Sequence, residues 1–419
     1  MDFDLMAALK GARQAAIEYS LYESGFKNSL LKAMGQALLD HYDEIKKVNE
    51  LDCEAAAQHG AAEAMVDRLL LTRARFEEMA GGFFKVAQLP DPLGIIGDGR
   101  TVLCGLSIVK RSVPLGVVGV IYESRPNVTA DIAALCLKSG NACVLRGGSE
   151  SLNTNRIIHR ILCEALEAAE GNPQGLCFID SPQRDLVELM LRQDDYIDVI
   201  IPRGGQALQR LCREKSSIPV ITGGFGISHI YVDDSADLPK AAAVVQNAKV
   251  QKPSACNAVD TVLVHEGVAA QFVPLLCEAL EPYGVELIVH GKAASLVGEY
   301  PYVREGSAED FDREMLSLRL NLAQVADVDE AIAHLHEHRA SHSDAILTDS
   351  LAHARRFTRA AGSACVYINA STRFTDGGQF DLGAEVAIST QKLHARGPMA
   401  LRELTTVQYV CEGDYLVRS

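Results

Sequence analysis

The feature that most constrains the fold is an alternation of short apolar runs with helical segments, which begins near Val113. The strand-like runs are residues 117–121, 142–145, 176–179 and 197–201. Helical patterns separate them, and Gly140 follows the first helix where it can adopt a left-handed cap. Strands that alternate with helices predict β-α-β units on a parallel sheet, so we expect an α/β fold.

Three polar loops follow these strands, at residues 123–127, 146–151 and 202–205. Ligands of open parallel sheets gather at the carboxyl ends of the strands, which makes each loop a candidate binding loop. Each also has a plain structural interpretation. A glycine pair after a strand is more often a tight turn than a phosphate cradle, and the full Gly-x-Gly-x-x-Gly pattern is absent.

A fourth loop, residues 250–260, carries a cysteine. Cys256 lies in a small polar segment between a helix-like run at 238–249 and a strand-like run at 261–264. Lys252 and nearby backbone N–H groups would favour its thiolate, which is the reactive form. Most intracellular cysteines are small buried hydrophobes, so both interpretations stay open from this stretch alone. A nucleophile is favoured if all four loops face one crevice.

Composition narrows the class of protein. A net charge of -15 argues against holding nucleic acid or an anionic membrane by bulk electrostatics, although a local basic pocket for phosphate remains open. The 11 cysteines are scattered without a C-x-x-C pair, which suits reduced thiols. The N-terminus lacks a signal-peptide pattern, and no apolar run approaches the ~20 residues of a membrane span. We expect a soluble, cytoplasmic protein with no nucleic-acid or membrane partner.

The remaining segments are less informative about chemistry. Residues 1–85 have helical periodicity without a notable titratable constellation, residues 91–94 predict a turn, and residues 101–111 predict one extended segment. A histidine group resembles a metal cluster, but its surroundings are typical of an amphipathic surface helix, so we expect no metal. Its members are His334, His336, His338 and His342. We assign no catalytic role to His394.

Several long motifs resemble the gamma-glutamyl phosphate reductase family, also called glutamate-5-semialdehyde dehydrogenases, within the aldehyde dehydrogenase superfamily. They are residues 113–129, 201–205, 253–257, 371–380 and 390–399. The resemblance covers nearly the whole chain. It implies the NADPH-dependent reduction of L-glutamyl 5-phosphate to L-glutamate 5-semialdehyde and phosphate through a cysteine thioester. This reaction is the second step of proline biosynthesis from glutamate.

The resemblance also implies roles for single residues. Cys256 becomes the nucleophile, and Asn127 occupies the position of the superfamily's oxyanion asparagine, paired with the Cys256 backbone N–H. Oxidising members carry a Glu-Leu-Gly-Gly motif whose glutamate activates water. Here residues 221–224 read Ile-Thr-Gly-Gly, so Ile221 replaces that base. The thioester would then be spared from water and left for hydride, as a reductase requires.

For the cofactor, NADPH, the resemblance supplies three sets of residues. A loop that contacts the adenosine ribose, Lys-Pro-Ser-Glu in the superfamily, is matched by Arg146, Ser149 and Glu150. Arg146 could grip a 2′-phosphate through two hydrogen bonds. Gly204 and Gly205 would let backbone N–H groups approach the pyrophosphate at a helix N-terminus. Glu314 aligns with the glutamate that holds the nicotinamide ribose, although by itself it would pass for a surface helix carboxylate.

The substrate carries two anionic ends, so its pocket needs cations. Our candidates are Arg125, Lys252 and Arg373, as a hypothesis from the residues rather than from the resemblance. Because exposed strands normally pair with another subunit, we expect a homodimer or homotetramer. A transient contact with glutamate 5-kinase is a further expected partnership.

The superfamily architecture implies a Rossmann-type cofactor domain, an α/β catalytic domain and a small β oligomerisation arm. The NADPH-binding domain is expected at 1–98, 112–234 and 371–386, the catalytic domain at 235–370, and the arm at 99–111 and 387–419. The active crevice would lie between the first two domains.

Two alternative functions are also consistent with parts of the sequence. One is another enzyme of the superfamily, either an aldehyde oxidiser or a CoA-acylating dehydrogenase. Ile221 argues against the oxidiser, and dependence on phosphate would discriminate against both. The other is a regulator or scaffold without catalysis, against which the presence of both Cys256 and Asn127 argues.

Overall fold

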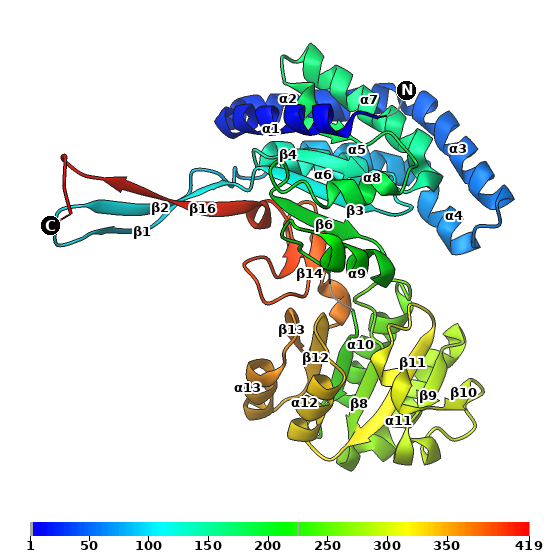
Figure 1. Ribbon diagram of the computed structural model, residues 1–419. Helices are drawn as coiled ribbons and strands as arrows, with labels where there is room; N and C mark the ends of the chain where they lie inside the picture. Colours follow the sequence, from blue (N-terminus) through cyan, green and yellow to red (C-terminus); the bar gives the residue numbers. More distant parts are fainter. Residues whose placement is uncertain (1–2, 224–225, 419) are drawn as a thin grey trace. The chain divides into compact units, whose positions relative to one another are not determined.

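The computed structural model describes residues 3–223 and 226–418 (Figure 1). Gly224, the last residue of the Ile-Thr-Gly-Gly stretch, therefore lies outside the described residues. The chain forms two compact units. Unit 1 comprises Met1–Thr222, Asp381–Ala387 and Met399–Ser419, and unit 2 comprises Gly223–Phe380 and Ile388–Pro398. Each unit has a parallel sheet with helices, which confirms the predicted α/β fold class.

Unit 1 begins with helices, as the periodicity of the first 85 residues predicts. They are α1 (Leu5–Leu21), α2 (Ser24–Asp40), α3 (Tyr42–Gln58), α4 (Glu63–Leu69) and α5 (Arg73–Gln88). α1 starts where the Asp4 carboxylate accepts the N–H of Ala7 at 3.0 Å, a standard N-cap. Leu9 and Ala12 of α1 pack into the same core as Val144 and Ile200 of the sheet.

The parallel sheet of unit 1 has the order β5-β4-β3-β6. Its strands are β3 (Val117–Tyr122), β4 (Ala142–Arg146), β5 (Leu176–Phe178) and β6 (Val199–Arg203). The helices between and after them are α6 (Asn127–Lys138), α7 (Leu152–Ala168), α8 (Asp185–Met190) and α9 (Gln206–Lys215). β3 and β4 are buried along their whole length, which explains the apolar runs at 117–121 and 142–145. Gly140 adopts φ 72° after α6, as predicted.

A separate antiparallel sheet of unit 1 consists of β1 (Ile96–Thr101), β2 (Ser107–Pro114) and β16 (Thr405–Glu412). It extends away from the helices of this unit (Figure 1). The single extended segment predicted at 101–111 is wrong, because the chain reverses at Gly105, which has φ 91°. β16 pairs with β2 along its full length, from Thr405 opposite Pro114 to Glu412 opposite Ser107. The role of this sheet in oligomerisation stays a prediction.

Unit 2 contains a seven-stranded parallel sheet of order β10-β9-β11-β8-β7-β12-β13. Its strands are β7 (His229–Val232), β8 (Thr261–His265), β9 (Glu286–Val289), β10 (Val303–Glu305), β11 (Arg319–Val325), β12 (Ser343–Leu347) and β13 (Cys365–Ile368). Its helices are α10 (Leu238–Val250), α11 (Glu266–Leu280), α12 (Val328–Glu337) and α13 (Leu351–Ala360). The cysteine loop joins α10 to β8, as predicted.

The boundaries of the units differ from the expected domain boundaries. Unit 2 begins at Gly223 and includes residues 371–380, whereas the catalytic domain is expected at 235–370; the assignment of cofactor and catalytic domains stays a prediction. A short pair of strands, β14 (Ala387–Ser389) and β15 (Gly397–Met399), lies where the chain passes between the units. Across the described residues, no helix is long and apolar enough to cross a membrane.

Candidate active site

The three loops at the carboxyl ends of the unit 1 strands meet, as predicted. β3 lies between β4 and β6, so the loop after β3 has a partner on either side. The N–H of Glu123 donates to the carbonyl oxygen of Arg203 at 3.2 Å. In the other direction, the N–H of Gly205 donates to Oε2 of Glu123 at 3.0 Å. A carboxylate thus accepts a hydrogen bond from Gly205, directly before α9, where we expect a pyrophosphate.

The loop after β4 contacts the same β3 loop from the other side. Oε1 of Glu150 accepts the Ser124 N–H at 2.9 Å and the Ser124 Oγ–H at 2.6 Å. Ser124 is buried, and its φ of 39° is unusual for a residue with a side chain. Ser149 is exposed, with its Oγ 3.5 Å from the other carboxylate oxygen of Glu150. Glu150 is therefore directed at the protein's own backbone.

Asn127 is the first residue of α6, and its side chain is hydrogen-bonded within the same helix. Its Nδ2 donates to Oδ2 of Asp131 at 2.9 Å, one turn further along. Burial raises the pKa of Asp131 to about 6, and the hydrogen bond from Asn127 opposes that rise. An amide nitrogen carries two donor protons, so the second N–H of Asn127 can still serve another acceptor.

Arg146 ends β4 and is buried, with 5% of its surface exposed. Its guanidinium donates to the backbone oxygen of Gly147 and, at 3.3 Å, to that of Pro182. Its Nε has no hydrogen-bond partner among the described residues. Burial lowers the pKa of Arg146, partly opposed by Glu150. A buried cation with a spare donor is a suitable partner for an anionic ligand.

In unit 2, Cys256 is exposed on its loop, as its expected role requires. The residue after it is tied to the 371–380 motif. Oγ1 of Thr372 donates to the backbone oxygen of Asn257 at 2.7 Å, and Nδ2 of Asn257 donates to the oxygen of Thr375 at 2.7 Å. The Arg373 guanidinium also donates to Oδ1 of Asn257. Two motifs that are more than 100 residues apart therefore form one structure around the cysteine.

The three proposed substrate cations occupy two units. Arg373 is half-buried, and burial lowers its pKa while the nearby Cys256 opposes that shift. Its Nε donates to Oε1 of Gln251 at 3.0 Å. Lys252 is exposed on the same loop, and Arg125 is exposed on the β3 loop of unit 1. The structure thus associates Arg373 and Lys252 with the cysteine loop.

Glu314 lies in a loop, so the interpretation as a surface helix carboxylate is wrong. Its Oε1 accepts the N–H of Gly226 at 2.9 Å, and burial raises its pKa. A Cβ on Gly226 would approach both this carboxylate and the Cys256 carbonyl oxygen closer than 3.0 Å. Glu314 and the Cys256 carbonyl therefore both lie close against Gly226.

Asp260 contacts the segments next to Glu314 and Gly226, and it was not among the residues expected from the sequence. It is 2% exposed, and its carboxylate accepts the N–H of Met315 at 2.8 Å and of Ser228 at 3.2 Å. Burial raises its pKa to about 6, opposed first by the buried Lys249. Asp260 thus joins the segments that carry Glu314 and Gly226. The available signal was an acidic residue shortly after Cys256 and directly before the apolar run at 261–264.

The four histidines differ in exposure: His336 is exposed on α12, as expected for an amphipathic surface helix, whereas His334 and His338 are partly buried and His342 is buried. His334 of α12 packs against Phe311 with ring centroids 4.6 Å apart, against His338 at 4.4 Å and against His229 at 5.4 Å. Burial lowers the pKa of His334 to about 3, so it is neutral. Among the described residues, these histidines do not form a group of three with metal-ligand spacing.

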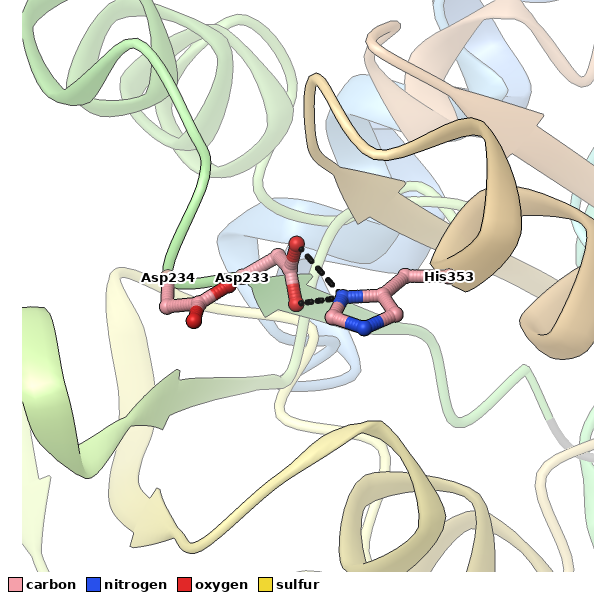
Figure 2. A group of neighbouring side chains, drawn as sticks. All are labelled: Asp233, Asp234 and His353. Carbon is pink, nitrogen blue, oxygen red and sulfur yellow. Dashed lines mark hydrogen bonds and ion pairs between the residues drawn. The ribbon is translucent and has the colours of Figure 1, made fainter.

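A different group, Asp233, Asp234 and His353, does have such spacing (Figure 2). Asp233 is fully buried and already accepts hydrogen bonds from His353 at 2.9 Å and from the hydroxyls of Ser235, Thr348 and Tyr231 at 2.7, 2.6 and 3.1 Å. The bond from His353 raises the histidine's pKa. Because its oxygens are engaged by protein donors, we interpret this group as a structural network.

Known proteins match the chain along its whole length. The aldehyde dehydrogenase family model matches residues 2–287. The protein of Photobacterium profundum named gamma-glutamyl phosphate reductase is 52% identical over 410 residues, and its Yersinia enterocolitica namesake is 50% identical over 417. Each alignment covers 98% of both chains.

Solved structures agree with the sequence matches. The crystal structure of gamma-glutamyl phosphate reductase from Thermotoga maritima superposes with a TM-score of 0.95 at 42% identity and full coverage of both chains. An acetylating aldehyde dehydrogenase of Geobacillus thermoglucosidasius, 17% identical over 99% of this chain and 97% of its own, has a TM-score of 0.70 and shows the shared fold alone. The chain is therefore an oxidoreductase of the aldehyde dehydrogenase family, in which a nicotinamide cofactor is used, and it belongs to the gamma-glutamyl phosphate reductases.

Proposed function

We propose that this chain reduces L-glutamyl 5-phosphate to L-glutamate 5-semialdehyde and phosphate with NADPH, through a thioester on Cys256. The observation that carries the proposal is the exposed Cys256 on a loop that is hydrogen-bonded to the 371–380 motif and whose Cys256 carbonyl lies close against Gly226. A nucleophile must be accessible and also fixed in position, because misplacement costs rate steeply. The names of the whole-length relatives supply the substrate.

Cys256 forms the covalent intermediate. Its thiolate attacks the acyl carbon, the bond from that carbon to the phosphate oxygen breaks, and phosphate leaves with the bonding pair. Arg373 interacts electrostatically with Cys256, and in general a nearby cation favours a thiolate. After reduction of the thioester carbon, collapse of the thiohemiacetal returns the thiolate and releases the aldehyde. One proton is taken up overall.

Asn127 is the proposed oxyanion donor, together with the backbone N–H of Cys256. The tetrahedral intermediates place negative charge on the former carbonyl oxygen, and donors fixed in advance stabilise that charge most. Asp131 accepts one proton of the Asn127 amide and so fixes which amide atom is presented. The second N–H is then the donor for the oxyanion.

The residues of unit 1 fit a phosphorylated dinucleotide. Gly204 and Gly205 lie directly before α9, and Arg146 has a buried Nε with no partner in the described chain. We assign the pyrophosphate to Gly204 and Gly205, and the 2′-phosphate of NADPH to Arg146 and Ser149. Glu314 would hold the nicotinamide ribose. A bound nicotinamide supplies hydride to the thioester carbon.

Ile221 supports reduction over oxidation by water. Its side chain is 3% exposed, and its N–H donates to the oxygen of Ile200 at 2.9 Å. A buried aliphatic side chain cannot act as a general base, so it gives the thioester no activated water. This favours the reductase over the aldehyde oxidiser.

The proposal also assigns the residues that bind the anionic groups of the substrate, the cellular compartment and the oligomeric state. Arg125, Lys252 and Arg373 are assigned to the substrate carboxylate and phosphate. The enzyme would act in the cytoplasm as a homodimer or homotetramer through the β1-β2-β16 sheet, whose outer strands leave backbone groups available for pairing. A transient contact with glutamate 5-kinase would deliver the unstable acyl phosphate.

The reverse reaction tests the proposal most directly. Purified protein is given glutamate semialdehyde and NADP⁺, with and without phosphate, and NADPH formation is followed by absorbance. We expect turnover that requires phosphate, is weaker with NAD⁺, and is lost in Cys256→Ser. The exposed Cys104 and Cys411 provide matched Cys→Ser controls that should keep activity. Turnover that requires CoA instead of phosphate, turnover with water alone, or a fully active Cys256→Ser variant would each refute the assignment.

A further inference from the structure

The loop that carries Asn127 is held in a conformation that it would not adopt alone. Ser124, three residues before Asn127, has φ 39°, a left-handed value that residues with a Cβ rarely adopt outside Asn and Asp. Ser124 is also buried, so water cannot satisfy its polar groups. Something in the surrounding structure must stabilise this backbone.

Glu150 supplies that stabilisation. Its Oε1 accepts both the backbone N–H and the hydroxyl of Ser124, at 2.9 and 2.6 Å. Hydrogen bonds to an ionised acceptor are roughly twice as strong as neutral ones. The carboxylate folds back over Gly148, where a Cβ would approach it far closer than 3.0 Å. Glycine at 148 is therefore what allows Glu150 to turn toward the β3 loop.

We propose that Glu150 is a positioning residue for the Asn127 loop, rather than chiefly a ligand of the adenosine ribose. The inference rests on the proposed function, because it takes Asn127 as the oxyanion donor. Oε1 accepts both hydrogen bonds from Ser124, and the partner that the described residues provide for Oε2 is the exposed Ser149 hydroxyl at 3.5 Å. The loop expected to bind the cofactor thus also fixes the residue expected to stabilise the transition state.

The test compares Glu150→Ala and Glu150→Gln with the wild-type enzyme in the phosphate-dependent reverse assay. A positioning role predicts that Glu150→Ala lowers kcat by about 10²-fold and leaves KM for NADP⁺ unchanged. Glu150→Gln should recover much of kcat, because its amide oxygen still accepts both bonds from Ser124. Glu188→Ala, an exposed glutamate on α8 of the same unit, is the matched control. A rise in KM for NADP⁺ with kcat preserved would overturn the inference in favour of ribose binding.

A second readout does not depend on catalysis. Hydrogen exchange followed by mass spectrometry reports the backbone between Ser124 and Asn127 in each variant. Faster exchange there in Glu150→Ala, restored in Glu150→Gln, supports the inference, and unchanged exchange refutes it. If the wild-type enzyme shows no phosphate-dependent turnover, the proposed function fails while this measurement still decides whether Glu150 holds the loop. Should Glu150→Ala not fold, Ser124→Ala removes one of the two bonds and should show a smaller change of the same kind.

Discussion

Asp52 caps α7, where its partner Thr154 lies 102 positions further along the chain. Replacing Asp52 should therefore lower the free energy of unfolding. It lies on α3 with 5% of its surface exposed, and its Oδ2 accepts the Thr154 N–H at 2.8 Å and the Thr154 hydroxyl at 2.7 Å. Thr154 is the third residue of α7, so its N–H has no partner within that helix. Asp52 also accepts from Asn153 at 2.8 Å.

The cost of Asp52→Ala follows from these three donors. The buried Thr154 N–H loses its acceptor, which costs about 1–3 kcal/mol. The Thr154 hydroxyl loses a charged acceptor, worth about 1 kcal/mol net, and the negative charge at the N-terminus of α7 adds roughly 0.5 kcal/mol. Asn153 is exposed and can bond to water instead. We therefore expect about 3 kcal/mol of destabilisation, and about a third of that for Asp52→Asn, which keeps an acceptor oxygen.

Urea unfolding followed by circular dichroism measures this loss, and hydrogen exchange of α7 localises it. Glu54→Ala, an exposed neighbour on α3, is the matched control and should stay within about 0.5 kcal/mol of wild type. The reasoning is refuted if Asp52→Ala costs as little as Glu54→Ala, or if exchange in α7 does not change.

Two further predictions concern the site. Asp131→Asn lets the Asn127 amide turn around and should lower kcat by up to about 10²-fold at constant KM. Burial places the pKa of Asp131 near 6, above its unfolded value, so its stabilisation is present at low pH and lost as pH rises through about 6. In Asp131→Asn, the melting temperatures measured below and above pH 6 should therefore differ less than they do in the wild-type protein. Gly226→Ala crowds the Cys256 carbonyl and should reduce kcat about 10²-fold, whereas Gly81→Ala, with open space around it, should keep wild-type rates. Normal rates in either site variant would contradict the argument.

Much of the fold is determined by local sequence. Strand and helix periods, and turn residues such as Gly140, act over a few positions, so the alternation after Val113 predicts the β-α-β units correctly. The cysteine loop between α10 and β8 follows from the same local signals. The expectations that were wrong also concern short segments of the chain. Residues 101–111 lack an obvious turn signal apart from Gly105, and Glu314 lies in a loop rather than on the expected surface helix.

The partners of the polar groups were decided only by the tertiary structure. Ser124 is hydrogen-bonded to Glu150, 26 positions away in the chain, and Thr154 to Asp52, 102 positions away. The strand order, with β3 between β4 and β6, brings the binding loops together, and no residue spacing encodes that order. A buried donor must find an acceptor wherever the packed chain places one. The sequence alone determined which residues are proposed to carry the chemistry, and the packing of distant elements determined how each of them is held.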